Sequence, residues 1–171
     1  MTYTNRRSFI KQSTLALAAA GVAPLIGFQP AENQQLCFST LGCPEWSFDK
    51  ILGFAVEHKY QAIEIRTIQK EIDIAKIAAF APANIAATKQ KLAANRIKLV
   101  DLGSSAALHH TDAATRKKHL DDARAYIDLA AKLGCPYIRV FPNNLPKDDS
   151  RKKILDLIVD GLNDLGAYSK G

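Results

Sequence analysis

Four short apolar segments alternate with four amphipathic segments along this sequence, and that order restricts the fold more than any other feature. The apolar segments have the length of strands and lie at residues 36–40, 62–66, 97–103 and 137–141. The amphipathic segments place apolar residues three or four positions apart, which is the spacing of one helix face. Strands that alternate with helices pair in parallel through right-handed crossovers. The sequence therefore predicts an α/β fold.

Capping residues mark the expected helix ends. Ser47 and Asp112 precede two of the amphipathic segments and can accept hydrogen bonds from the first backbone N–H groups of a helix. Ser150, or an aspartate just before it, can do the same for the last segment. Asn95 and Gly134 follow two segments and are residue types that end helices.

Apolar spacing predicts which side of two helices is buried. The helix expected over residues 48–58 should turn inward Ile51, Leu52, Ala55 and Val56. The last helix should bury Ile154, Leu155, Ile158, Val159 and Leu162.

The predicted strands carry charged residues where a strand covered on both faces should be apolar. Successive side chains of a strand point to opposite faces. This alternation puts on one face the aliphatic residues Ile63, Ile65, Val100, Leu102, Ile138 and Val140. It puts on the other face Glu64, Arg66, Leu99, Asp101 and Arg139. Each of these three strands thus has one aliphatic face and one face that carries charge.

A closed barrel accommodates such strands better than a doubly wound sheet, which packs helices on both faces. No G-x-G-x-x-G or P-loop follows the first strand, so a nucleotide-binding fold has little support. In a (β/α)8 barrel one face meets the helices and the other points into the lumen, whose C-terminal mouth holds the active site. Arg139 is therefore expected near a polar site. The charged residues could equally form a structural network among themselves, and the two interpretations are compatible.

Residues 1–31 resemble a twin-arginine signal peptide. Arg6 and Arg7 precede Phe9 and Lys11, and a run of small and apolar residues follows. The resemblance implies export to the periplasm, and residues 32–171 would then form the folded domain. The run is too short and too rich in Ala and Gly to predict a stable membrane anchor. An ordinary amphipathic N-terminal helix is the alternative.

Charge gives little support to a nucleic-acid partner. The formal net charge is +6, from 23 basic and 17 acidic residues. Three of the basic residues and none of the acidic ones lie in residues 1–31, so 20 minus 17 leaves +3 for the rest. These charges are spread along helices and not clustered in one block, so we expect no nucleic-acid partner.

Three cysteines, Cys37, Cys43 and Cys135, follow the signal-like segment. An odd number cannot all pair within one chain, and none is spaced from another Cys or a His as zinc ligands are. Cys37 and Cys135 lie in or beside apolar strands, where a free cysteine acts as a small hydrophobic residue. The sequence predicts no zinc site and no essential disulfide.

Three stretches resemble one known family. They are "CFSTLGCPEWSFDKILGFAVEHKYQAIEIR", "KLVDLGSSAALH" and "DARAYIDLAAKLGCPYIRVFPNN". Together they resemble the first four strand units of sugar phosphate isomerase/epimerase proteins, which have the xylose isomerase-like TIM barrel of the AP endonuclease family 2 superfamily. The resemblance implies a (β/α)8 barrel of which this chain holds only the first four βα units. We expect a fragment, with a natural half-barrel that forms a homo-oligomer as the alternative.

The family resemblance also implies a chemistry. It is proton transfer next to a sugar carbonyl, assisted by a divalent metal, Mn or Mg, with Zn or Co as further candidates. The implied ligands are two Glu, one Asp and one His at the ends of strands five to eight. Those positions do not occur in this sequence, so no metal ligand in this chain is predicted and the catalytic residues are unknown.

Eight residues are candidates for binding a sugar or sugar phosphate: Trp46, Glu64, Arg66, Asp101, Ser104, His109, Arg139 and Asn143. Trp46 could stack on a sugar or plug the barrel top, and an arginine suits an anion because its donors are planar. Ser104, with Ser105, could donate to a ligand or only form a turn. The family resemblance is the reason for naming His109.

The leading hypothesis is an exported, metal-dependent sugar isomerase or epimerase. The alternative is a non-catalytic carbohydrate-binding or scaffold protein on the same barrel. DNA repair has the least support, because export would separate the protein from genomic DNA.

Overall fold

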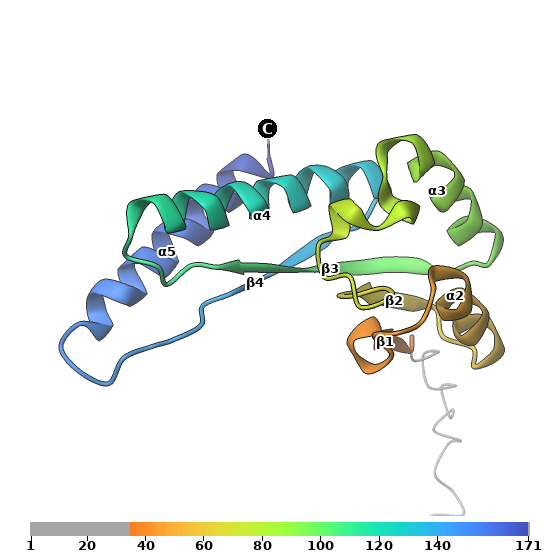
Figure 1. The fold of residues 1–171 in the computed structure, drawn as a ribbon, viewed down its shortest axis with the longest axis horizontal. Coiled ribbons are helices and arrows are strands. Elements are labelled where there is room, and N and C mark those ends of the chain that lie inside the picture. The colour runs from red at the N-terminus through yellow and green to blue at the C-terminus, as the bar shows by residue number, and fades with distance from the viewer. Residues whose placement is uncertain (1–34, 171) are drawn as a thin grey trace, which may run out of the picture. The chain divides into compact units, whose positions relative to one another are not determined.

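The computed structural model describes residues 35–170, which form one folded unit around a four-stranded sheet (Figure 1). The strands are β1 (Cys37–Ser39), β2 (Ala62–Ile65), β3 (Lys98–Ala107) and β4 (Tyr137–Phe141). They lie side by side in sequence order, and every neighbouring pair is parallel. The predicted α/β fold with parallel strands is therefore confirmed. The signal-like residues 1–31 lie outside the described residues.

Four α-helices follow the strands: α2 (Phe48–Glu57), α3 (Ile85–Ala94), α4 (Ala113–Leu133) and α5 (Arg151–Tyr168). Short 3₁₀ helices occupy the loops: η2 (Thr40–Gly42) after β1, and η3 (Ile74–Lys76), η4 (Ala78–Phe80) and η5 (Pro82–Asn84) after β2. Figure 1 shows α3 and α4 over the same side of β3. None of the helices in the described part is long and apolar enough to span a bilayer.

The predicted caps are mostly correct. The Ser47 hydroxyl accepts a hydrogen bond from the Lys50 N–H, and Asp112 accepts one from Thr115. Gly134 ends α4 with a φ of 73°, in the left-handed region that glycine adopts without strain. Ser150 precedes α5 but its side chain caps nothing, because its hydroxyl donates to Asp148 instead.

The core lies between the helices and one face of the sheet. Its main cluster includes Ile51, Leu52, Ile63, Ile65 and Leu102, all 3% exposed or less. A second, smaller cluster joins the end of β3 and its following loop to α4 and α5. The helix-facing side of β2 and β3 is thus fully covered.

A β-bulge changes the predicted alternation in β3. Ile63 pairs with Leu99 and Glu64 pairs with Asp101, so Val100 is an extra residue between two paired positions. Leu99 and Leu102 therefore both enter the main core, and the prediction that Leu99 shares the face of Asp101 is wrong. The bulge also sets Asp101 directly beside Glu64.

Several apolar residues predicted to be buried are exposed. They are Val56, Leu155, Val159 and Leu162. Ile154 and Ile158, in contrast, are buried as predicted. The position of α5 explains why Leu155, Val159 and Leu162 are exposed. This helix follows the last strand, and within residues 35–170 other elements pack against it on one side only.

The three cysteines are all free. Cys135 is buried, as expected for a small hydrophobic residue, but Cys37 is exposed and that prediction is wrong. Cys37 lies in β1, which is an edge strand of the sheet formed by residues 35–170.

Candidate functional site

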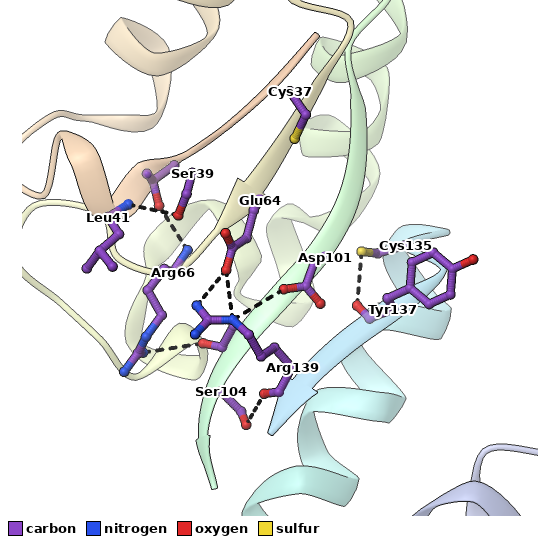
Figure 2. A network of polar contacts seen from close by, with 12 residues as sticks. Cys37, Ser39, Leu41, Glu64, Arg66, Asp101, Ser104, Cys135, Tyr137 and Arg139 are labelled. Atoms are coloured by element: carbon purple, nitrogen blue, oxygen red, sulfur yellow. Dashed lines mark hydrogen bonds and ion pairs between the residues drawn. The ribbon is translucent and has the colours of Figure 1, made fainter. Parts of the chain in front are cut away.

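A charged network joins β2, β3 and β4 on the face opposite the helices (Figure 2). The Arg139 guanidinium donates from Nη2 and Nε to Glu64 Oε1, at 2.5 and 3.0 Å. Its Nε lies 3.9 Å from Asp101 Oδ2. One arginine therefore bridges two carboxyl groups from two other strands, so Glu64, Asp101 and Arg139 pair as the network interpretation expects, whereas Arg66 donates to Gly103 and Ser105 instead.

The strand register produces this arrangement. Glu64 pairs with Asp101, and Asp101 pairs with Tyr137 two residues before Arg139. The long Arg139 side chain then reaches back over Gly103, its own neighbour in register, to the two acids. The three charged residues come from three strands, so only parallel pairing in this register brings them together.

Gly103 leaves the space that the network occupies. A Cβ atom at this position would lie 2.8 Å from Arg66 Cδ and 2.9 Å from Arg139 Nη2, closer than real contacts allow. Any larger residue would push the two arginines away. Gly103 is not among the predicted site residues, although a glycine inside a predicted strand is a recognised sign of close approach.

Arg66 connects β2 to the far end of β3. Its Nη1 donates to the Gly103 carbonyl at 3.3 Å, and its Nη2 donates to the Ser105 hydroxyl at 2.9 Å. Its backbone N–H and that of Thr67 both donate to Thr40 Oγ1, at 2.9 and 3.1 Å. Thr40 is fully buried and ties the loop after β1 to the end of β2. No sequence pattern pointed to Thr40.

The two carboxyl groups of the network are electrostatically unequal. Burial, and next the repulsion from Glu64, raise the pKa of Asp101 to about 6, although Arg139 opposes the rise. Asp101 can therefore hold a proton close to neutral pH. Arg139 also makes a cation–π contact with Phe141, since its Cζ lies 5.0 Å from the centre of the Phe141 ring.

Ser104 has a structural contact. Its hydroxyl donates to the Arg139 carbonyl at 2.6 Å and accepts from the Ala106 N–H at 3.2 Å, and the residue is fully buried. It thereby holds β3 to β4 where the register between them shifts. A role for Ser104 in substrate binding stays a prediction.

Three histidine rings lie close together beyond the end of β3, with His110 stacked on His119 and His109 tilted by 36° to His110. The ring centres of His109 and His110 are 4.2 Å apart, and those of His110 and His119 are 4.4 Å apart. His119 Nδ1 accepts a hydrogen bond from the Ala107 N–H at 3.2 Å. Burial lowers the pKa of His109 and of His119, and the neighbouring His110 lowers both further. Of these three histidines, only His109 is among the residues predicted to bind substrate.

Trp46 and Asn143 lie apart from the network. Trp46 packs edge-on against Phe54 with ring centres 5.1 Å apart, and Lys50 Nζ lies 4.5 Å from its ring centre. Asn143 follows β4 with a φ of 51°, an unusual backbone conformation for a non-glycine residue. Within residues 35–170 neither side chain joins the network through a hydrogen bond or ion pair, and their predicted contacts with substrate stay predictions.

The described residues do not form a metal centre. Among residues 35–170 no group of three or more His, Cys, Asp or Glu side chains is arranged to hold a metal ion. Glu64 and Asp101 are instead paired with the cationic guanidinium of Arg139. These residues therefore do not fit the divalent metal that the family resemblance implies.

Solved structures similar to this one share the barrel fold. The IOLI protein with a bound zinc atom matches with a TM-score of 0.65 and 17% identity, covering 79% of this chain and 47% of that chain. D-Psicose 3-epimerase with D-tagatose from Clostridium cellulolyticum H10 matches with a TM-score of 0.60 and 15% identity, covering 78% and 48%. The chain thus spans about half the length of these proteins.

A third neighbour is a xylose isomerase-like TIM barrel protein from Mycobacterium smegmatis in complex with magnesium. It has a TM-score of 0.53 and 17% identity, and the match covers 80% of this chain and 51% of that chain. No curated protein matches the sequence. The model of the family described as "Xylose isomerase-like TIM barrel" matches residues 52–170, which is most of the chain. The four parallel strands with their helices are thus four βα units of that barrel, and the chain belongs to the xylose isomerase-like TIM barrel family.

Proposed function

We propose that the complete protein is a sugar isomerase or epimerase that moves a proton next to a sugar carbonyl. The observation that carries this proposal is the Glu64–Arg139–Asp101 network on the face of the sheet opposite the helices, which is the side that lines the lumen in this fold. Family membership and the sugar-epimerase neighbour support the same chemical class.

In this proposal the network forms one polar wall of the sugar site. The carboxylate oxygens of Glu64 and Asp101 accept hydrogen bonds from sugar hydroxyls, while Arg139 keeps the two acids close together. Asp101 can release or take up a proton near neutral pH, because its pKa is about 6. A divalent metal, held by residues other than those described, would polarise the carbonyl oxygen.

The arginines of this wall favour an uncharged sugar over a sugar phosphate. Arg66 already donates to the Gly103 carbonyl and to Ser105, and Arg139 is paired with Glu64. A phosphate group would have to compete with these partners. A sugar that brings hydroxyl groups alone fits the engaged arginines better.

The test is solvent-proton exchange by the complete protein. The protein is incubated in D₂O with ketohexoses or ketohexose phosphates, and with Mn, Mg, Zn or Co. We expect deuterium next to the carbonyl of a free sugar, seen by NMR, and at least a tenfold loss with Glu64→Gln. Absence of exchange with every sugar and metal would refute the proposal. Exchange with the phosphates alone would refute only the preference for an uncharged sugar.

A non-catalytic carbohydrate-binding protein is the second candidate. It is favoured by the mutual pairing of the network, in which Glu64, Arg66 and Arg139 already have partners within the protein. Sugar binding seen by calorimetry, without deuterium exchange under any metal, would select it.

We also propose that the protein is exported through the twin-arginine route. The proposal rests on the sequence of residues 1–31, including Arg6 and Arg7, because these residues lie outside the described ones. Replacing both with lysine should keep the protein in the cytoplasm, whereas the unchanged protein should appear in the periplasmic fraction. Equal fractionation of both forms would refute this proposal.

A further inference from the structure

The short segment between β3 and α4 is held at both of its ends. Before it, the Leu108 N–H donates to the Phe141 carbonyl at 2.9 Å, and the Leu108 carbonyl accepts from Arg116 Nη1 at 2.9 Å. After it, the Asp112 side chain caps the first turn of α4. Residues 109–111 lie between these two anchors. A movement of this segment can therefore stay local and leave the sheet unchanged.

The contact between the end of β3 and α4 requires a neutral imidazole ring. His119 of α4 accepts a hydrogen bond at its Nδ1 atom from the Ala107 N–H, at 3.2 Å. A neutral imidazole has one nitrogen that can accept, whereas both nitrogens of a protonated ring are donors. Protonation of His119 therefore replaces this hydrogen bond with two donors that face each other.

His109 also fits its place only as a neutral ring. Its Nδ1 atom is buried and has no hydrogen-bond partner within residues 35–170. A buried lone pair without a partner costs some free energy, but a buried N–H on a positively charged ring costs much more when it has no acceptor. The described residues themselves enclose this nitrogen. A protonated His109 must therefore leave its position to reach water.

His110 lies between the other two rings and couples them. Its ring centre is 4.2 Å from that of His109 and 4.4 Å from that of His119. Burial, and next the charge of His110, lower the pKa of both neighbours below the ordinary value of 6.5. Arg116 adds a further cation beside His109, since it donates to the Leu108 carbonyl. The packed arrangement is therefore favoured above about pH 6.5 and becomes less stable as pH falls below it.

The other charged groups around the rings do not remove this repulsion. On α4, Asp122 raises the pKa of His119, but Lys118 lowers it by more, and the two pair with each other at 2.6 Å. In the loop, Asp112 is attracted to His110, whose charge lowers the pKa of Asp112. Asp112 already accepts hydrogen bonds at the start of α4, so it does not neutralise the other two rings.

We propose that residues 109–111 form a pH-sensitive segment, which packs against α4 while the three histidines are neutral and detaches from α4 on acidification. Leu108 and Asp112 are the two fixed ends. The segment follows β3, at the strand end where this fold holds its active site, so its detachment changes the shape of the barrel mouth. The inference is independent of the proposed sugar chemistry, because it uses no residue of the charged network.

Hydrogen exchange of single amides in the complete protein, followed by NMR, tests the proposal. Each rate is divided by the intrinsic rate at the same pH. Between about pH 7.5 and about pH 5, we expect the protection of the Ala107 amide to fall at least about tenfold, because its acceptor is lost. The Leu108 amide, bonded to the Phe141 carbonyl, is the internal control and should keep its protection. Contacts between the rings of His110 and His119, seen as NOEs, should disappear over the same range.

Two variants separate the titration of the rings from their packing. In His119→Gln the amide oxygen can accept from the Ala107 N–H but does not titrate, so the protection of Ala107 should be the same at both pH values within about twofold. His110→Phe keeps a flat ring without a charge and should reduce the fall. The matched control His58→Gln changes a histidine at the end of α2, outside this cluster, and should leave the fall unchanged.

Four results would overturn the proposal. The first is an Ala107 amide that keeps its protection at about pH 5. The second is a loss of protection shared by Leu108 and the amides of β2, which would be general unfolding. The third is an unchanged fall in both His119→Gln and His110→Phe. The fourth is protection of Ala107 at about pH 7.5 that depends on added Zn²⁺ and is accompanied by shifts of all three rings, which would indicate a metal site instead.

Discussion

Within residues 35–170, β2 and β3 have a strand on each side, whereas β1 and β4 have one neighbouring strand each. In the middle of the sheet Ile63, Ile65 and Leu102 are almost completely buried. At its end, Ile138 and Val140 of β4 point toward the helices but are only partly buried. The apolar pattern is similar in both regions, so the difference in burial comes from the number of neighbours. The free energy of folding should therefore be concentrated in the middle.

The strongest test of this comparison is a truncation in the middle of the sheet. Leu102→Ala should lower the free energy of unfolding by about 2–5 kcal/mol, because Leu102 is fully buried and a cavity would remain. Urea denaturation measures the change. Ile72→Ala, at a half-exposed residue, should change the same quantity by no more than about 0.5 kcal/mol. Similar losses for the two variants would refute the comparison.

Gly103→Ala should give the next largest effect. The new methyl group would lie too close to Arg66 and Arg139, so the network must shift at a cost of about 1–3 kcal/mol. Gly42→Ala is the matched control, since a Cβ atom there would meet nothing within 4 Å. Thermal unfolding of the two variants should separate them clearly. A Gly103→Ala protein as stable as the Gly42→Ala protein would show that the network adapts freely.

Arg139→Met should cost less, about 1–2 kcal/mol, because the pair with Glu64 is partly exposed to solvent. Without its cation, the pKa of Asp101 should rise further above about 6, since Arg139 now lowers it. Lys152→Met breaks a well-exposed pair with Asp156 and should have almost no effect on stability. An NMR titration of the Asp101 carboxyl carbon measures the shift, and a fall in this pKa would contradict the network.

The smallest expected effect is on the pH dependence of stability. The pKa of Asp101 is raised in the folded chain from 3.8 to about 6, so the folded state binds the proton more tightly than the unfolded state. The contribution of Asp101 to stability is therefore fully present below about pH 4 and is lost as pH rises through about 6.

Asp101→Asn removes this dependence. The melting temperature of the variant, relative to the unchanged chain, should be higher at pH 7.5 than at pH 4. The control Asp160→Asn, at an exposed residue of α5, should give a flat difference over the same range. A flat difference for Asp101→Asn as well would show that Asp101 is not perturbed.

Most of the fold could be predicted from the sequence, because the signals involved are local. Caps such as Ser47, Asp112 and Gly134 act within one turn of their own helix. Alternation in β2 and β4 correctly placed Glu64 and Arg139 on the face away from the aliphatic residues. These patterns depend on neighbours in the chain and not on distant segments.

Part of the candidate site could not be predicted. The space above Gly103 and the two hydrogen bonds accepted by Thr40 join residues that are far apart in the chain. The position of Asp101 beside Glu64 needs the bulge at Val100, and periodicity alone assigns Leu99 to the wrong face. Such contacts depend on strand register, which a single strand does not determine.

The sequence by itself determined that strands and helices alternate, that the strands run parallel, and that one face of the sheet carries charge. The tertiary structure decided which charged side chains pair, that Gly103 leaves room for them, and which apolar side chains of α5 are exposed within residues 35–170. The physical reason is the distance along the chain over which each interaction acts. Hydrogen bonds within a turn and alternation along a strand act over a few residues, whereas burial and ion pairing depend on which distant segment lies alongside.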